Sequence, residues 1–198
     1  MPPLLKLRRT FLNVVGDCRA LYRHCLTPYA HHSHAGVEAA FLQMFKSWES
    51  FQEECTIAFL AGRLRADGRI VACHVSAPDE ETARNFLYLG RPYLEWTEAD
   101  AVMGRWDILF LPPNLLTLAV RPSKPELNQM KVLRNAIAHS SPISDRRFHD
   151  LIIRTLGGRP PISRPAQFLG TAYPTDPTRT LFDRYADVLE VTAAAITG

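Results

Sequence analysis

A guanidinium and an imidazole lie close together in the second half of the chain. Arg134 and His139 are separated by four residues, in the sequence Arg-Asn-Ala-Ile-Ala-His. Histidine can take up or release a proton near neutral pH, and arginine keeps its charge and presents a planar fork that matches two phosphate oxygens. This pair could therefore hold a phosphodiester and move protons to or from it.

Cleavage of RNA without a metal requires a base for the 2′-OH proton, an acid for the leaving 5′ oxygen and a cation for the charge that develops on the phosphorane. We expect His139 to act as general base or acid, and Arg134 to clamp the phosphate and stabilise the transition state. This segment of one chain offers a single imidazole. Two copies meeting at one phosphate would supply both imidazoles, so this chemistry predicts a homodimer with a composite site.

Other polar residues accompany the pair. Lys131, Asn135 and His139 step by four residues, which places them in one row on a helix. Asn135 could hydrogen-bond the ribose or fix the tautomer of the imidazole, and Lys131 and Ser140 are candidates for phosphate contacts. These residues complete the predicted substrate-binding set.

The segment that carries the pair has the pattern of a helix with a buried face. Apolar residues recur there at three- and four-residue intervals, at Leu127, Met130, Leu133 and Ile137. On an ideal helix Arg134 and His139 would lie about 140° apart around the axis, so they should not touch directly. They could still serve one site through a long arginine arm, through a second chain, or through a helix end near the motif. Pro142, which follows two serines, favours such an end.

The motif and its surroundings resemble a known superfamily. Residues 134–139 are similar to the Arg-x(4–6)-His signature of HEPN domains, and residues 133–148 resemble the RiboL-PSP branch and a neighbouring branch. Residues 48–54 and 93–96 look like the same families, so the resemblance covers nearly the whole chain. It implies a single all-α domain over residues 1–198, a multi-helix up-down bundle.

The resemblance also implies an activity. Many HEPN domains are metal-independent endoribonucleases that act as dimers, need no cofactor and leave a 2′,3′-cyclic phosphate. Relatives suggest a toxin or phage-defence (antiviral) role, with an antitoxin or another regulatory protein as a possible partner. Other HEPN members have no nuclease activity and serve as nucleotide-binding, RNA-binding or protein-pairing modules, and this alternative stays open.

Two acidic residues of an earlier helix are candidates for supporting the pair. Residues 35–64 predict a long helix, on which Glu49 and Glu53 form a row beside an aromatic stripe. They are either solvated acids, or one of them pairs with Arg134 or orients His139. The competing structural interpretation has Arg134 pair elsewhere, with Glu54 or Glu126, and makes His139 a histidine stabilised by the helix dipole.

Charge is unevenly distributed along the chain. The 198 residues are 46% hydrophobic, enough for a sizeable core, and the net charge is only +3. Residues 121–159 nevertheless carry eight Lys or Arg against three acids, whereas residues 77–107 carry seven acids against three Arg. The basic half contains the motif, as a phosphate-bearing ligand would require.

Neither a metal centre nor a membrane location is predicted. The four cysteines show no Cys-x-x-Cys spacing, and His31, His32 and His34 lack a carboxylate or cysteine at helical spacing, so we expect no metal and a solvated histidine loop. The N-terminus lacks a signal-peptide core, and no apolar run approaches the roughly 20 residues of a membrane helix. A cytoplasmic location is the simplest expectation.

The remaining pattern predicts how the elements follow one another. We expect helices over residues 4–26, 35–64, 79–90, 97–109, 144–157 and 178–196, and a motif helix that begins at 122–125. Residues 65–78 could be a hairpin or an irregular connection, and 159–178, with five prolines, read as an extended strap before the C-terminal helix. The expected caps are Thr97 with Asp100, Ser123 and Ser144.

Overall fold

The elements follow from the apolar spacing, and most are helical. A computed structural model describes residues 3–26, 33–139, 141–158 and 160–198. Its elements are α1 (Pro3–Cys25), α2 (Ser33–Leu60), α3 (Glu80–Tyr88), α4 (Ala99–Leu109), α5 (Leu115–Val120), a 3-10 turn (Arg121–Ser123), α6 (Lys124–Ala138), α7 (Pro142–Leu156), α8 (Pro165–Leu169), β1 (Ala172–Tyr173), β2 (Asp176–Thr180) and α9 (Leu181–Thr197). The predicted all-α class is confirmed.

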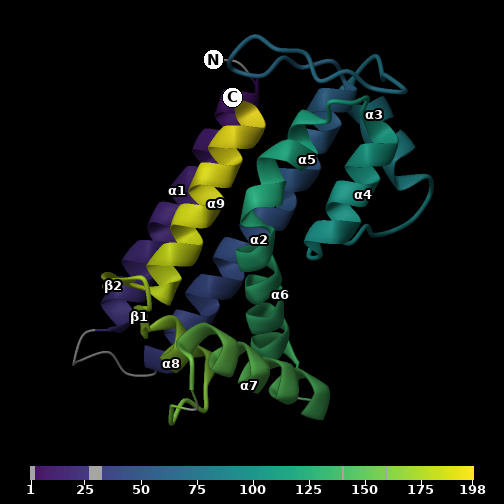
Figure 1. Cartoon of the computed structure of the whole chain (residues 1–198). Coiled ribbons are helices and arrows are strands. Elements are labelled where there is room, and N and C mark those ends of the chain that lie inside the picture. Colours follow the sequence, from purple (N-terminus) through teal and green to yellow (C-terminus); the bar gives the residue numbers. More distant parts are fainter. Residues whose placement is uncertain (1–2, 27–32, 140, 159) are drawn as a thin grey trace.

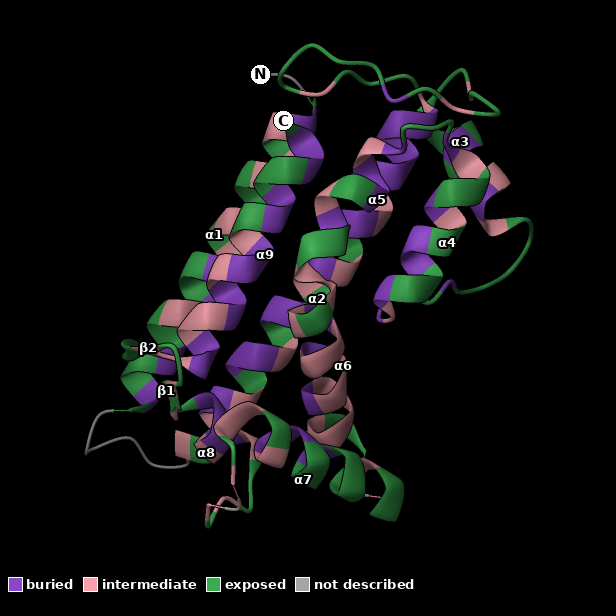
Figure 2. Cartoon of the chain, viewed as in Figure 1, coloured by how far each residue is buried: buried purple, intermediate pink, exposed green. Residues whose placement is uncertain are grey.

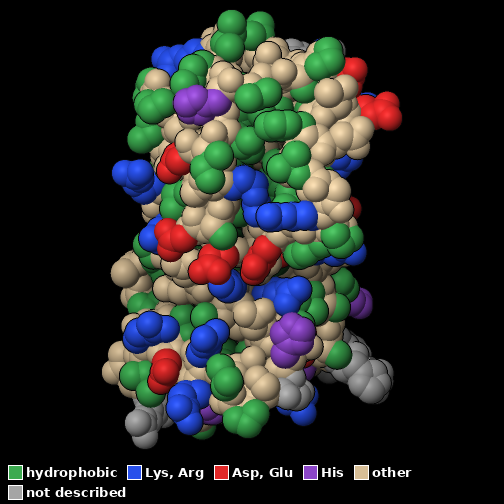
Figure 3. All heavy atoms as spheres, turned by 90° about the vertical axis from the view of Figure 1, so that its right-hand side faces the viewer, with side chains coloured by type: hydrophobic (Ala, Val, Ile, Leu, Met, Phe, Trp, Pro, Cys, Tyr) green, Lys and Arg blue, Asp and Glu red, His purple; other side chains and the backbone are tan. Residues whose placement is uncertain are grey.

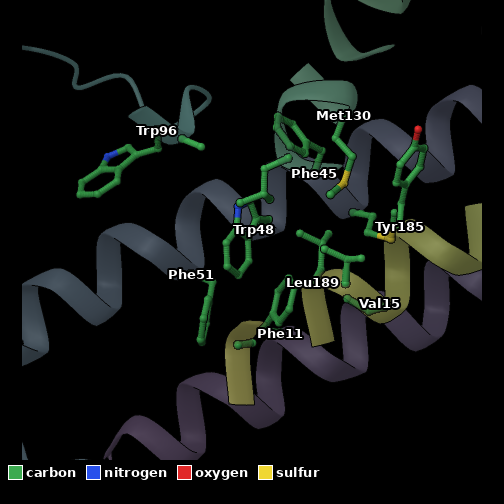
Figure 4. Close-up of a cluster of buried hydrophobic side chains, with 14 of the residues drawn as sticks. Phe11, Val15, Phe45, Trp48, Phe51, Trp96, Met130, Tyr185 and Leu189 are labelled. Carbon is green, nitrogen blue, oxygen red and sulfur yellow. The ribbon is translucent and has the colours of Figure 1, made fainter. Parts of the chain in front are cut away.

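The core lies between the long helices. α1 and α9 run side by side next to α2, and α7 crosses the lower end of the bundle (Figure 1). Large aromatic and aliphatic side chains from these helices meet in one cluster (Figure 4), in which the rings of Phe11 and Phe51 stack at 5.0 Å. Buried residues line the facing sides of the helices, whereas the first turns of α7 are exposed (Figure 2). Removal of this apolar surface from water is the main stabilising contribution.

A chain of hydrogen bonds anchors α4 on α2 inside the core. Trp106 of α4 is fully buried, and its Nε1 donates to Thr56 Oγ1 at 2.8 Å. The hydroxyl of Thr56 donates to the carbonyl of Gln52, and Gln52 Nε2 donates to the carbonyl of Trp96 at 3.1 Å. The side chains of Gln52 and Thr56 are thus both buried and hydrogen-bonded, as is usual for buried polar groups.

The motif helix α6 buries the predicted face. Leu127, Met130 and Leu133 are buried and Ile137 is partly buried, which places α6 against α2 and fixes the direction in which its polar row points. At its start Ser123 occupies the cap position but makes no capping hydrogen bond, because its hydroxyl is paired with Thr192 of α9. The expected cap by Ser123 is therefore absent.

Two other cap predictions are wrong. α7 begins at Pro142, and Ser141 caps it by accepting from the backbone N–H of Ser144. Ser144, the predicted cap, therefore lies inside the helix. α4 begins at Ala99 without a side-chain cap, so Thr97 and Asp100 form no capping box. Instead Asp100 binds Lys124 at 2.7 Å.

The proline-rich segment is more regular than predicted. Residues 159–178 were expected to be an extended strap, yet they contain α8 and much of a small antiparallel sheet of β1 and β2. Gln167 Oε1 accepts the backbone N–H groups of Ser163 and Arg164 and so closes the start of α8. Residues 65–78 form an irregular connection, in which Cys73 makes an isolated bridge to Phe110.

Candidate functional site

The candidate pair sits where α6 ends. The helix stops at Ala138, and His139 follows with extended backbone angles (φ −136°, ψ 112°) while its N–H still bonds to the carbonyl of Asn135. The imidazole therefore points in a different direction from the one it would have if the helix continued through His139. Arg134 Nη1 and His139 Nε2 lie 3.1 Å apart. The expectation that the two side chains do not touch is wrong, and the reason is the helix end that was named as one route to a shared site.

The contact sets a chemical requirement on the imidazole. A guanidinium has donors and no acceptor, so a hydrogen bond at this contact needs the lone pair of His139 Nε2, which is present in the tautomer that carries its proton on Nδ1. Arg134 Nη1 also donates to Asn135 Oδ1 at 3.2 Å. Asn135 thus positions the guanidinium, and it does not hold the imidazole. Arg134 is half-buried and His139 is exposed, so a ligand can reach the ring from solvent.

Glu49 of α2 lies within electrostatic range of Arg134. Burial raises the pKa of Glu49 above its ordinary value of 4.5, while Thr97, Arg134 and, more weakly, Lys46 act to lower it. Its Oε1 is buried without a hydrogen-bond partner among the described residues. Of the two expected supporting acids, Glu49 is therefore the one placed to act on Arg134.

Replacing Glu49 with glutamine tests this environment. Because the pKa of Glu49 is raised in the folded state, its contribution to stability is present below the unfolded pKa and is lost as the pH rises through the folded pKa. We therefore expect the free energy of unfolding of Glu49→Gln, minus that of the wild type, to increase from pH 4 to pH 7. Urea unfolding at both pH values measures this, with the exposed Glu81→Gln as control. A wild-type-to-variant difference that does not change with pH would refute the assignment.

Glu53 belongs to a different contact. Its Oε1 accepts from Arg84 Nη1 at 2.8 Å and from the hydroxyl of Tyr88 at 2.7 Å, which ties α2 to α3. Burial and this carboxylate raise the pKa of Tyr88 to about 12. The structure therefore gives Glu53 no role beside Arg134 or His139.

The competing pairing of Arg134 does not occur either. Glu54 is bound by Arg84 and Glu126 by Arg184, so neither forms an ion pair with Arg134. Within the described ranges Arg134 makes no ion pair, and its side-chain hydrogen bonds go to Asn135 and His139. Its guanidinium keeps donors for a ligand.

A groove opens between α6 and α7, lined by Asn135 but by neither Arg134 nor His139. It has a volume of about 390 Å³ and is lined by Lys131 and Asn135 of α6 and by Arg147 and Arg154 of α7, among others. Lys131 Nζ is bound to Glu98 at 2.8 Å, so its charge is already paired. Arg147 and Arg154 are exposed and were not singled out from the sequence, although both lie in the basic stretch 121–159. Ser140 lies outside the described residues.

Basic side chains gather around this end of the molecule. Figure 3 shows Lys and Arg side chains over the lower part of the face, below a band of acidic ones. Exposed arginines of α7, Arg146, Arg147 and Arg154, form no ion pair within the described part of the chain. Cations without an acidic partner at the same end of the molecule as an exposed imidazole favour an anionic ligand.

The described residues contain no group of three or more His, Cys, Asp or Glu side chains that could hold a metal ion. Of the histidine cluster, His34 lies in α2, and His31 and His32 fall outside the described residues. Cys18, Cys25 and Cys55 are buried free thiols, and burial raises the pKa of Cys18 to about 11. In the described ranges, no helix combines the length and apolar character needed to cross a membrane.

Comparison with protein-family models, with curated proteins and with solved structures finds no significant match for this chain. The case for a function therefore depends on the geometry at the end of α6 and on the chemistry of its residues.

Proposed function

We propose that this chain is a metal-independent endoribonuclease of the HEPN type, which cleaves RNA by attack of a 2′-OH on the adjacent phosphate. The observation that carries the proposal is the 3.1 Å contact between Arg134 Nη1 and His139 Nε2 at an exposed helix end. It brings together the two side-chain types that this reaction needs, on one accessible edge of the protein.

The contact suggests how binding of substrate makes His139 available as a base. A phosphate attracts the guanidinium of Arg134 more strongly than a neutral ring nitrogen does, because both partners are charged and the fork is bidentate. When Arg134 turns to the phosphate, the lone pair of His139 Nε2 becomes free. That nitrogen then accepts the proton of the 2′-OH as general base.

The reaction proceeds by transfer within the substrate. The 2′ oxygen forms a bond to phosphorus while the bond from phosphorus to the 5′ oxygen breaks, which leaves a 2′,3′-cyclic phosphate and a 5′-OH. Arg134 neutralises the charge on the non-bridging oxygens as the phosphorane forms. A second, protonated imidazole must protonate the leaving oxygen, and His139 of the partner subunit is the group of the right chemistry.

Two features of α7 support a dimer and a polyanionic substrate. Ile143 lies in the first turn of α7, close in sequence to His139, and is 67% exposed, an apolar side chain that a second copy would cover. Arg147 and Arg154 line the groove beside Asn135 and could bind phosphates that flank the cleaved bond. Glu98, Asp100 and Asp150 also line this groove, but Glu98 and Asp100 are bound to Lys131 and Lys124. A homodimer acting on RNA accounts for both features.

Arg134→Lys tests the proposal at the phosphate clamp. Lysine keeps the charge and loses the planar fork, so we expect the rate of cleavage of a labelled single-stranded RNA to fall by about 10²–10³-fold. Arg146→Lys is the matched control, because Arg146 is an exposed arginine of α7 and does not contact His139. Equal rates for wild type and Arg134→Lys would contradict a role for the guanidinium in the transition state.

A further inference from the structure

A second surface, away from the candidate site, has the character of a binding groove. It lies between α3 and α4, beside the upper part of α2, whereas α7 lies at the other end of the bundle (Figure 1). The groove has a volume of about 480 Å³, and its apolar lining includes Phe86, Leu87, Leu89, Leu94 and Ile108. Nothing in the proposed nuclease chemistry uses this surface.

The rim of this groove holds the two most exposed large apolar side chains in the described part of the chain. Leu89 is 74% exposed and Ile108 is 76% exposed. Figure 3 shows hydrophobic side chains gathered over the upper half of this face. A contiguous exposed apolar patch is characteristic of a surface that another molecule covers.

The backbone at Leu89 adds a second observation. Leu89 has φ 46°, and it is the one non-glycine residue with a positive φ among the residues that the structure describes. Glycine adopts this left-handed conformation without steric conflict, whereas leucine is disfavoured there. Leu89 is the C-cap that ends α3, where its N–H bonds to the carbonyl of Asn85, and this cap leaves the leucine side chain largely in solvent.

Arginines are the charged residues that line the groove. Arg105 stacks on the ring of Trp96 at 4.5 Å and donates through Nη2 to the carbonyl of Glu95, while its Nη1 is buried without an acceptor. Arg91 forms no ion pair within the described residues. The Glu95 carboxylate acts on Arg105 only at longer range.

The acids of this segment are largely bound to other cations. Asp100 binds Lys124, Glu98 binds Lys131, and Glu80 binds Arg63. Within the described residues, neither Arg91 nor Arg105, which both line this apolar groove, has a carboxylate within ion-pair distance. A ligand that brings apolar side chains together with carboxylates would complement them.

The exposed face of α4 is shaped for close approach. Ala101, Gly104 and Ile108 follow one another at three- and four-residue spacing and are all exposed, and a Cβ added at Gly104 would meet no atom within 4 Å. Small residues let another helix come close, and the exposed Ile108 offers it an apolar contact. The open rim suits a segment laid along the groove more than an enclosed small molecule.

We propose that the α3–α4 groove binds an amphipathic helix of another protein, whose apolar side chains at three- and four-residue spacing enter the groove and whose flanking carboxylates bind Arg91 and Arg105. The inference does not depend on the proposed nuclease activity. It would hold for a catalytic protein and for a binding module alike.

Selection from a display library tests the proposal. Helical peptides of roughly 16 residues, about four turns, would be selected on the full chain from a library without charge bias. We expect the selected peptides to carry Leu, Ile or Phe at helical spacing next to Asp or Glu. Their Kd should rise about tenfold or more for Ile108→Asp and several-fold for Arg91→Glu. Val191→Asp, at a 68% exposed apolar residue of α9, is the matched control and should leave Kd unchanged.

The other outcomes overturn the proposal. Peptides without acidic enrichment, peptides whose Kd ignores Ile108→Asp, or no selected peptide at all would each refute it. Sedimentation of wild type and Ile108→Asp covers the remaining occupant: a dimer that Ile108→Asp dissociates would mean that a second copy fills the groove. Circular dichroism of each variant confirms that it is folded.

Discussion

Replacing His139 with alanine is expected to lower the rate of RNA cleavage by about 10²–10⁴-fold, the usual contribution of a general acid or base. The side chain is exposed and lies beyond the last residue of α6, so its removal takes nothing from the core. The backbone N–H that closes the helix end on Asn135 is kept in the variant. Initial rates on a 5′-labelled RNA, measured together with thermal unfolding, would separate lost chemistry from lost structure.

His149→Ala provides the matched control. His149 is also exposed and lies on the neighbouring helix α7, where its ring is 6.3 Å from that of Phe148, but it makes no contact with Arg134. We expect this variant to cleave at nearly the wild-type rate. If both alanine variants cleaved as fast as the wild type, His139 would not be the base or acid.

Replacing Trp106 with alanine is expected to lower the free energy of unfolding by about 3–5 kcal/mol. The indole is fully buried between α4 and α2. Its removal leaves a cavity and also takes away apolar surface that folding would otherwise bury. The hydrogen bond from Nε1 to Thr56 is lost at the same time. Equilibrium urea unfolding, read by far-ultraviolet circular dichroism, measures the difference.

Trp106→Phe separates packing from hydrogen bonding. Phenylalanine fills part of the volume and cannot donate to Thr56, whose own hydroxyl remains bonded to the carbonyl of Gln52. We expect a smaller loss, about 1–2 kcal/mol. A loss below about 1 kcal/mol for Trp106→Ala would show that α4 is not anchored through this residue.

Apolar periodicity was enough to predict the long helices. α1, α2, α6, α7 and α9 lie close to the predicted ranges, because each buries a stripe whose spacing is visible in the sequence. The proline-rich stretch was harder to predict. Proline composition alone favours an extended chain, whereas α8 and the small sheet are held by local bonds, such as those of Gln167, and by packing of Phe168 in the core.

Helix starts were predicted least well, since several hydroxyl groups compete for each one. Ser141 and Ser144 are three residues apart, and either could cap a helix that begins near Pro142. Ser123 found a tertiary partner in Thr192, which the local sequence does not reveal. Tertiary contacts therefore decided which polar side chain satisfied the backbone.

For the candidate site, the sequence indicated which side chains could do the chemistry but not how they lie relative to one another. Arg134 and His139 were found by residue type and spacing, but their contact depends on the extended backbone of His139. The row of Glu49 and Glu53 could not show which acid faces Arg134, because that depends on Arg84 of α3 taking up Glu53. Sequence spacing shows which residues share a face of a helix, but only the tertiary structure shows which residues of other helices lie against that face.

End-group analysis of RNA incubated with the protein in EDTA is the decisive experiment for the proposed nuclease. We expect the wild-type protein still to cleave and to leave 2′,3′-cyclic phosphate and 5′-OH ends, while His139→Ala leaves almost all of the RNA intact. Fragments with 3′-OH ends, cleavage abolished by EDTA, or RNA that stays uncut by the wild type would contradict the proposal.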